Sequence, residues 1–369
     1  MLQQSPRKPR ARELGLDFEG EAGPFNALTD VPGVLVGTST LIDDARPSGR
    51  PVRTGVTTVL PHGLDRALRP VWAGFHALNG NGEVTGVHWI RHAGHFCGPI
   101  CLTNTHSVGM MHHAVTGWMI EHFSDEFRQK HLWALPVVAE TYDGVLNDIN
   151  GQHLRPEHLR ESIAEARSGP MPEGNVGGGT GMIAYEFKGG TGTASQVVEL
   201  GGAKFTLGVL VQANHGLRDW LTISGVPVGR FMRDDLLHAR EQGSIIAVIG
   251  TDAPLLPGQL ERIASRAALG IGRHGTPGGN SSGDMFLAFS TANPVSRAAF
   301  AGARRTMDCV PDEWLDPLYL ATVRATDEAV VNAMLAAESM STVKPAGKTC
   351  RAIDHDILLD ILGRHGRLR

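Results

Sequence analysis

Cysteine, tyrosine and long apolar runs are all scarce in this chain of 369 residues. Four cysteines are too few for a disulfide framework in a chain of this length; they are Cys97, Cys101, Cys309 and Cys350. No apolar run approaches the roughly 20 residues of a membrane-spanning helix, and the basic N-terminus lacks the apolar segment of a secretory signal. We therefore expect a cytoplasmic protein without a membrane partner.

The chain also lacks a strong charge of one sign. Its net charge is −4, and no basic stripe appears beyond the first dozen residues, so we expect no nucleic-acid partner. The glycine-rich run at 177–181 can cradle a phosphate, but no Gly-Lys-Ser/Thr sequence follows it. We expect no nucleotide or other organic cofactor.

Histidine is the residue that brings a metal site into question. His88, His92 and His95 have the spacing of one helix face. Gly86 and Gly94 interrupt the segment, so we do not expect a helix there, and we expect no bound metal.

What the chain does have is enough apolar sequence, 41% of its residues, to bury a large core. Strand-like segments arrive in blocks with helices between them, and alternation of single strands with helices is weak. This pattern favours an α+β sandwich of sheets covered by helices. We interpret residues 1–24 as an arm and 25–369 as one domain; the expected helices are 106–123, 155–167, 257–271 and 316–338.

Two shorter segments carry local expectations. The run Asn79-Gly80-Asn81-Gly82 predicts left-handed turn conformations, because asparagine and glycine adopt them most readily. The sequence MIAYEF at 182–187 predicts a strand.

Gly243-Ser244 is the first candidate for chemistry, because a serine opens the apolar run IIAVIG after a polar segment. The Ser244 hydroxyl can attack the Gly243 carbonyl in a strained turn, which glycine tolerates. The freed α-amine, with a pKa of roughly 8, can then act as the base for its own hydroxyl. The same pattern also fits a serine that merely begins a strand.

Ser282 and Asp284 form the second candidate, in a glycine-rich turn that can present a hydroxyl and a carboxylate together. An ordinary turn with side-chain-to-backbone hydrogen bonds fits the same residues. Asn214 ends an apolar strand and can donate to an oxyanion. Tyr142, one of only three tyrosines, can donate from its phenol. Turn and packing roles remain open for both.

Eight short motifs resemble, in order, those of the DmpA family of L-aminopeptidase/D-Ala-esterase/amidases, which includes the β-peptidyl aminopeptidases. The resemblance spans roughly residues 25 to 340. The motifs are NGNGE (79–83), TNTHS (103–107), ETYDG (140–144), GGGTG (177–181), VQAN (211–214), GSII (243–246), TDAPL (251–255) and SGD (282–284).

The resemblance implies an αββα sandwich related to the ornithine acetyltransferases. It implies that the catalytic domain cleaves itself at Gly243–Ser244, into an α chain (1–243) and a β chain (244–369). The family's nucleophile falls on Ser244, its supporting hydroxyl and carboxylate on Ser282 and Asp284, and its oxyanion donors on Asn214 and Tyr142. A homotetramer of processed units is implied as well.

We therefore expect a self-processing serine aminopeptidase. It would remove the N-terminal residue from peptides, amides or esters that bear a free amine, with Asp284 binding a cationic group or orienting Ser282. Two alternatives remain. An acyltransferase resembling the ornithine acetyltransferases would use threonine where Ser244 stands, and a processing-dead binding protein would keep its chain intact.

Overall fold

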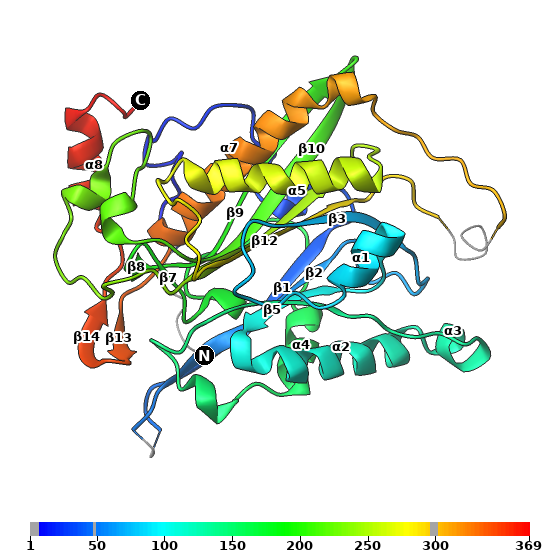
Figure 1. The fold of residues 1–369 in the computed structure, drawn as a ribbon, viewed down its shortest axis with the longest axis horizontal. Helices are drawn as coiled ribbons and strands as arrows, with labels where there is room; N and C mark the ends of the chain where they lie inside the picture. The colour runs from blue at the N-terminus through cyan, green and yellow to red at the C-terminus, as the bar shows by residue number, and fades with distance from the viewer. Residues whose placement is uncertain (1–6, 47–48, 296–301) are drawn as a thin grey trace.

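The computed structural model describes residues 7–46, 49–295 and 302–369, and two β-sheets packed face to face form its centre (Figure 1). The larger sheet has the strand order β4-β3-β12-β11-β10-β9. Its strands are β3 (Val71–Ala77), β4 (His95–Phe96), β9 (Gly190–Leu200), β10 (Ala203–Asn214), β11 (Ser244–Thr251) and β12 (Gly283–Ser290). The pair β11–β12 is parallel and the other neighbours are antiparallel.

The smaller sheet has the order β1-β2-β5-β6, with only the pair β5–β6 parallel. Its strands are β1 (Leu35–Asp43), β2 (Val52–Leu60), β5 (Ile100–Asn104) and β6 (Val137–Thr141). Both faces of the two sheets are covered, which explains why β2, β5, β6, β11 and β12 are buried along their whole length.

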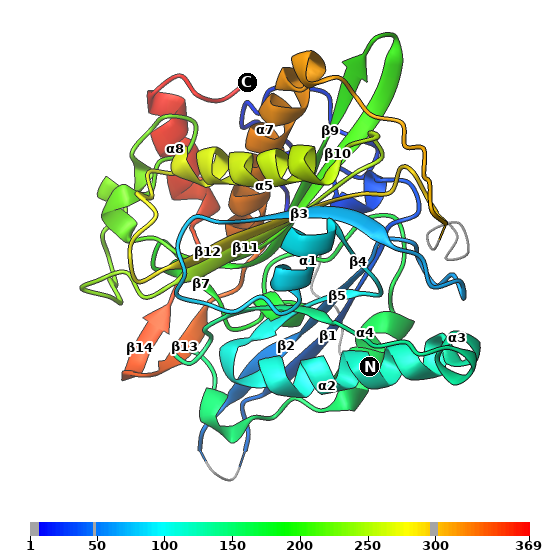
Figure 2. The ribbon, with the colours of Figure 1, turned by 45° about the vertical axis from the view of Figure 1, so that its right-hand side comes forward.

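Two pairs of helices form the outer layers (Figures 1 and 2). Helices α5 (Pro257–Gly272) and α7 (Asp316–Leu335) pack on the larger sheet, and α2 (Val108–His122) and α4 (Pro156–Ala164) pack on the smaller one. Three apolar clusters fill the spaces between the four layers. The expected αββα sandwich is confirmed, as are the four expected helices within a few residues at their ends.

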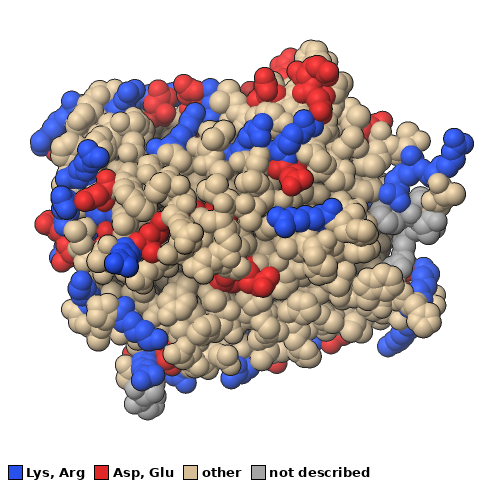
Figure 3. Space-filling view, viewed as in Figure 1, with Lys and Arg blue, Asp and Glu red and all other residues tan. Residues whose placement is uncertain are grey.

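The remaining elements lie at the edges of the sandwich. They are α1 (Val87–Ala93), α3 (Ser124–Gln129), α8 (His355–Arg364), β7 (Ile183–Ala184), β8 (Phe187–Lys188), β13 (Met340–Val343) and β14 (Ala346–Cys350). Residues 7–24, the described part of the expected arm, lie against α7. Arg12 pairs with Glu328 at 2.8 Å, and Leu16 is only 2% exposed. Figure 3 shows most acidic and basic residues around the rim of one face, with a few of both signs near its middle.

Three local expectations were wrong. Val87–Ala93 is a helix, because Gly86 and Gly94 adopt left-handed conformations at its two ends instead of interrupting it. No residue of 79–82 has a positive φ; the segment lies along the loop 279–284, where Asn81 Nδ2 donates to the Ser281 carbonyl at 2.6 Å. The stretch 182–187 is a tight hairpin of β7 and β8, with Tyr185 at φ 51°.

The three histidines of residues 88–95 do not form a cluster with other metal-binding side chains. His88 and His92 lie on α1, and His95 begins β4 after the helix has ended. Across residues 7–46, 49–295 and 302–369, no group of three or more His, Cys, Asp or Glu side chains could hold a metal ion.

Candidate active site

Ser244 is the first residue of β11, in the middle of the larger sheet, and is 4% exposed. It pairs with Asn214 on the antiparallel neighbour β10 and with Gly283 on the parallel neighbour β12. The bond between Gly243 and Ser244 therefore lies where the polar segment enters the sheet, between the ends of two neighbouring strands.

Gly243 is required by its contacts and not by an unusual φ. A Cβ atom on this residue would lie 2.7 Å from the Cα of His215 and closer still to the carbonyl oxygen of Asn214. Real Cβ atoms essentially never approach so closely. The absence of a side chain lets the peptide before Ser244 rest directly on the backbone of β10.

Ser282 and Asp284 are joined by a hydrogen bond at the start of β12. The Ser282 hydroxyl donates to Asp284 Oδ1 at 2.6 Å, and Asn79 Nδ2 donates to Oδ2 at 3.0 Å. Ser282 and Asp284 are both fully buried. Burial raises the pKa of Asp284, although the hydrogen bonds from Ser282, Asn79 and the Ile245 amide oppose that shift. Its carboxyl group is thus fixed toward Ser282.

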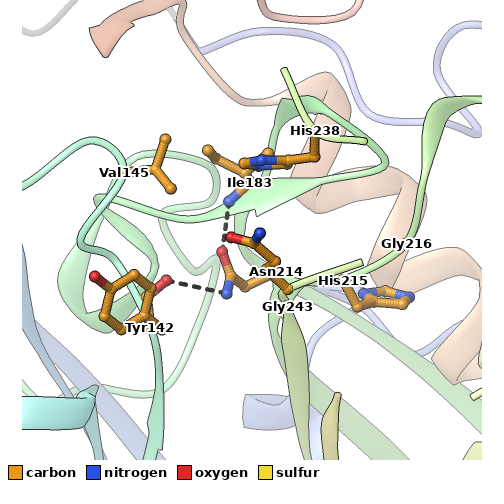
Figure 4. A pocket seen from close by; sticks show the side chains of 9 residues that line it. Tyr142, Val145, Ile183, Asn214, His215, Gly216, His238 and Gly243 are labelled. Carbon is orange, nitrogen blue, oxygen red and sulfur yellow. Dashed lines mark hydrogen bonds between the residues drawn. The ribbon is translucent and has the colours of Figure 1, made fainter. Parts of the chain in front are cut away.

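Asn214 lies between two backbone groups in a small pocket beside the Gly243–Ser244 bond (Figure 4). Its Oδ1 accepts from the Ile183 amide at 2.8 Å, and its Nδ2 donates to the Tyr142 carbonyl at 3.1 Å. These contacts fix the amide plane and use one of its two N–H bonds. The pocket is lined by Tyr142, Val145, Ile183, Asn214, His215, Gly216, His238, Gln242 and Gly243.

Tyr142 reaches this pocket from the other sheet, just after β6 ends. It is 37% exposed, and its ring folds over Gly144 so closely that a side chain there has no room. All five candidate residues therefore border the same strand ends: Ser244, Asn214, Ser282 and Asp284 from the larger sheet and Tyr142 from the smaller one.

Two carboxylates near the site were missed by sequence reasoning. Glu140 on β6 is 3% exposed; its Oε1 accepts from the Glu83 amide at 2.9 Å, its Oε2 accepts from the Thr105 hydroxyl, and burial raises its pKa. It lies beside Gly82, which packs on Gly283. The signal was its place in the ETYDG motif, two residues before Tyr142. The second carboxylate, two residues before Gly243, is Glu241, which is only 9% exposed although it belongs to a polar segment.

The fold and the position of Ser244 together define the class of protein. A serine freed at an N-terminus can use its own α-amine as base, and an αββα sandwich with a serine opening a central strand fits a hydrolase of that kind. The chain matches the family model "Peptidase family S58" over residues 26–347, so it belongs to peptidase family S58.

Named relatives agree with this assignment. The chain is 46% identical to the β-peptidyl aminopeptidase BapA of Sphingosinicella microcystinivorans, over 99% of this chain and 94% of that protein. It also resembles the solved L-aminopeptidase D-Ala-esterase/amidase from Ochrobactrum anthropi, described as a variant of the Ntn hydrolase fold, with a TM-score of 0.94 and 54% identity over 98% of this chain and all of that one. A Burkholderia sp. β-aminopeptidase matches with a TM-score of 0.88 and 42% identity over 97% and 99% of the two chains.

The predicted family, fold and enzyme class are thereby confirmed. The chain is an aminopeptidase, a hydrolase with the Ntn type of fold, and peptides are its class of substrate. Within the part of the chain that the structure describes, no helix is long and apolar enough to cross a membrane.

Proposed function

We propose that the chain cleaves itself between Gly243 and Ser244 and then uses Ser244 to remove the N-terminal residue of substrates with a free amine. The observation that carries this proposal is the position of the bond, with glycine held against the Asn214 carbonyl and serine opening β11. The β chain then begins at the nucleophile, Ser244.

The cleavage proceeds by an acyl shift. Ser244 Oγ adds to the Gly243 carbonyl carbon, its proton passes to the Ser244 nitrogen, and the C–N bond breaks to leave an ester and a free amine. Water then hydrolyses the ester, giving a Gly243 carboxylate and restoring the Ser244 hydroxyl. In turnover, the new α-amine takes the proton from the same hydroxyl while it attacks the substrate carbonyl.

Asn214 stabilises the oxyanion in both reactions. One Nδ2 hydrogen is occupied by the Tyr142 carbonyl, which orients the other without any reorganisation during the reaction. Tyr142 lines the same pocket and is the second donor that we propose; its phenol oxygen points away from Asn214 in Figure 4, so the side chain has to turn for this role.

Asp284 orients Ser282 and does not bind the substrate amine. Its burial and its hydrogen bonds from Ser282 and Asn79 support this assignment, because a cationic substrate would have to displace one of them. Ser282 in turn supports the nucleophile from the position just before β12, the parallel neighbour of β11.

The substrates we propose are peptides, amino-acid amides and esters with a free amine. The names of two relatives support this range, since one is an L-aminopeptidase and D-Ala-esterase/amidase and the other a β-peptidyl aminopeptidase. We also propose a cytoplasmic homotetramer of processed units. Four cysteines in 369 residues are too few for the dense disulfide framework of small secreted domains, which supports the compartment, and a native mass near four chain masses would support the tetramer.

The decisive experiment is the mass of the denatured, purified protein together with N-terminal sequencing. We expect two chains, residues 1–243 and 244–369, with the second beginning Ser-Ile-Ile-Ala-Val. Ser244→Ala, which removes only the hydroxyl, should remain one chain and hydrolyse no amino-acid p-nitroanilide. An intact wild type, or cleavage before Ser282, would contradict the assignment of the nucleophile.

A further inference from the structure

Glu241 is a buried carboxylate on the segment that leads into the Gly243–Ser244 bond. Its neighbours Arg240 and Gln242 are exposed, whereas Glu241 is 9% exposed. A glutamate turned inward from a polar segment is costly unless its carboxylate has a specific partner. The roles proposed above for Ser244 and its neighbours do not account for the burial of Glu241.

The partner is the backbone just beyond β10. Glu241 Oε1 accepts from the Gly216 amide at 2.9 Å. Oε2 packs on Gly279, where a Cβ atom would lie 3.1 Å from the carboxyl carbon and closer still to Oε2, and the Gly279 amide favours the charged form of the carboxylate. The carboxylate thus contacts the segments that adjoin two strands beside the nucleophile, one after β10 and one before β12.

This contact extends the β10–β11 ladder past its last pair. The ladder ends at Asn214 and Ser244; two residues beyond Asn214 is Gly216, and three residues before Ser244 is Glu241. Since backbone pairing has stopped there, the side chain of Glu241 replaces it. Gln242 and Gly243 are then held between the carboxylate and the first residue of the strand.

The polar segment is anchored a second time further upstream. Glu186 Oε1 accepts from the amides of Leu237 and His238 at 2.6 and 2.8 Å, and the side chain of Leu237 is 8% exposed. The remaining freedom before the bond lies in residues 239–243, and Glu241 sits in the middle of that stretch. A single hydrogen bond at this point therefore restricts where the Gly243 carbonyl can lie.

We propose that Glu241 is a positioning residue for self-cleavage, holding the Gly243 carbonyl for attack by Ser244, and that it has no part in aminopeptidase turnover. This inference rests on the cleavage site proposed above. Self-cleavage and aminopeptidase turnover can depend on Glu241 differently. After cleavage, Glu241 belongs to the α chain and is no longer covalently linked to Ser244.

We also expect the new C-terminal end of the α chain, residues 241–243, to move out of the pocket after cleavage. Burial raises the pKa of Glu241 and the nearby charge of Asp284 adds to that shift, whereas hydrogen bonds from the Gly216 and Gly279 amides oppose it. Cleavage places a further carboxylate, on Gly243, in the same region. Repulsion among these groups favours release of 241–243, which line or adjoin the pocket.

The test compares three replacements of Glu241 in the full chain, followed by pulse-chase in cell-free translation. Glu241→Met fills the space without an acceptor, Glu241→Asp keeps the charge but is shorter by one methylene, and Glu241→Gln keeps both length and a carbonyl acceptor. We expect the Met and Asp variants to cleave at least about tenfold more slowly than wild type, because misplacing the reacting groups by about 1 Å has effects of this size. Glu241→Gln should restore most of the rate.

Arg240→Ala, at the exposed neighbour, is the matched control and should cleave like wild type. The chains that do cleave should hydrolyse an amino-acid p-nitroanilide at the wild-type rate per mole of β chain, to within about twofold. A role in packing alone would be served by Met, so normal cleavage of Glu241→Met would overturn the inference. Equal losses of cleavage and of turnover in the Met or Asp variant would overturn it too.

The two proposals fail differently. If the wild type stays intact, or is cut elsewhere, both are wrong. If the wild type is cut before Ser244 and the Glu241 variants are cut equally fast, only the role of Glu241 is wrong. If Glu241→Met does not fold, the self-cleavage rates of Glu241→Asp and Glu241→Gln test the role of Glu241.

Discussion

Asn214 and Ser244 face each other as the terminal pair of the antiparallel β10–β11 ladder. Side chains of directly opposed residues lie on the same face of a sheet, with their Cβ atoms about 5 Å apart. The same Asn214 also supports Gly243 through its carbonyl oxygen. Asn214 thus contacts both sides of the scissile bond. Its carbonyl oxygen lies against Gly243, and its side-chain amide lies beside Ser244.

Asn214→Ala should lower kcat for an amino-acid p-nitroanilide by about 10²- to 10³-fold, the usual effect of removing one oxyanion donor. KM should change little, because the oxyanion forms only in the transition state. Because Asn214 also serves self-cleavage, the variant should be processed more slowly, and steady-state kinetics per mole of β chain formed after prolonged incubation measure both constants. Asn175→Ala, which removes an asparagine bonded to Glu338 instead, should be neutral; a raised KM with unchanged kcat would contradict the role of Asn214.

Gly243→Ala should slow self-cleavage at least about tenfold, because the new methyl displaces the peptide from the Asn214 carbonyl. The intact fraction in timed samples, read on a denaturing gel, measures the effect. Gly258→Ala places the same methyl in open space on α5, so it should be cleaved at the wild-type rate. Equal rates for the two variants would show that the contact is unimportant.

Asp284→Asn should lower kcat by roughly tenfold or more, since a hydrogen bond to a charged acceptor is worth about 1.5–3 kcal/mol, while KM stays near the wild-type value. The reason is that Asp284 accepts a hydrogen bond from Ser282, and we propose that it acts through Ser282 and does not bind the substrate. Ser282→Ala should have a similar effect, and the double variant should add little to either. A rise in KM confined to Asp284→Asn would instead assign the substrate amine to Asp284.

Asp143→Asn should change how stability depends on pH. Burial raises the pKa of Asp143 from 3.8 to about 7, although the Asn147 side chain donates to it. The folded state therefore binds the proton more tightly than the unfolded state, and stability is lost as pH rises from about 4 to about 7. Over that range the wild type should lose up to roughly 4 kcal/mol relative to the variant.

Denaturant unfolding of an uncleaved Ser244→Ala background, with and without Asp143→Asn, measures this difference. Groups common to both chains cancel in the comparison. A gap in unfolding free energy that does not change between pH 4.5 and pH 8 would show that Asp143 titrates normally.

Local patterns were reliable where the structure depends on neighbouring residues. The helix at 257–271 was predictable because its apolar residues recur at helical spacing and a proline opens its first turn. The same logic failed at Val87–Ala93, a short helix whose two bounding glycines look like interruptions in the sequence. It also failed at Asn79, whose side chain bonds Asp284 at a distance of 205 positions, a partner that no local pattern reveals.

From the sequence alone it follows that a serine comes after glycine at the start of an apolar strand, that Ser282 and Asp284 are near neighbours, and that eight ordered motifs mark one family. The folded structure adds that Ser244 pairs with Asn214 and Gly283, that Asp284 accepts from Ser282, and that Glu241 is buried against Gly216. The physical reason is that strand register and burial are set by packing between segments far apart in the chain, whereas turn and strand propensities act within a few residues.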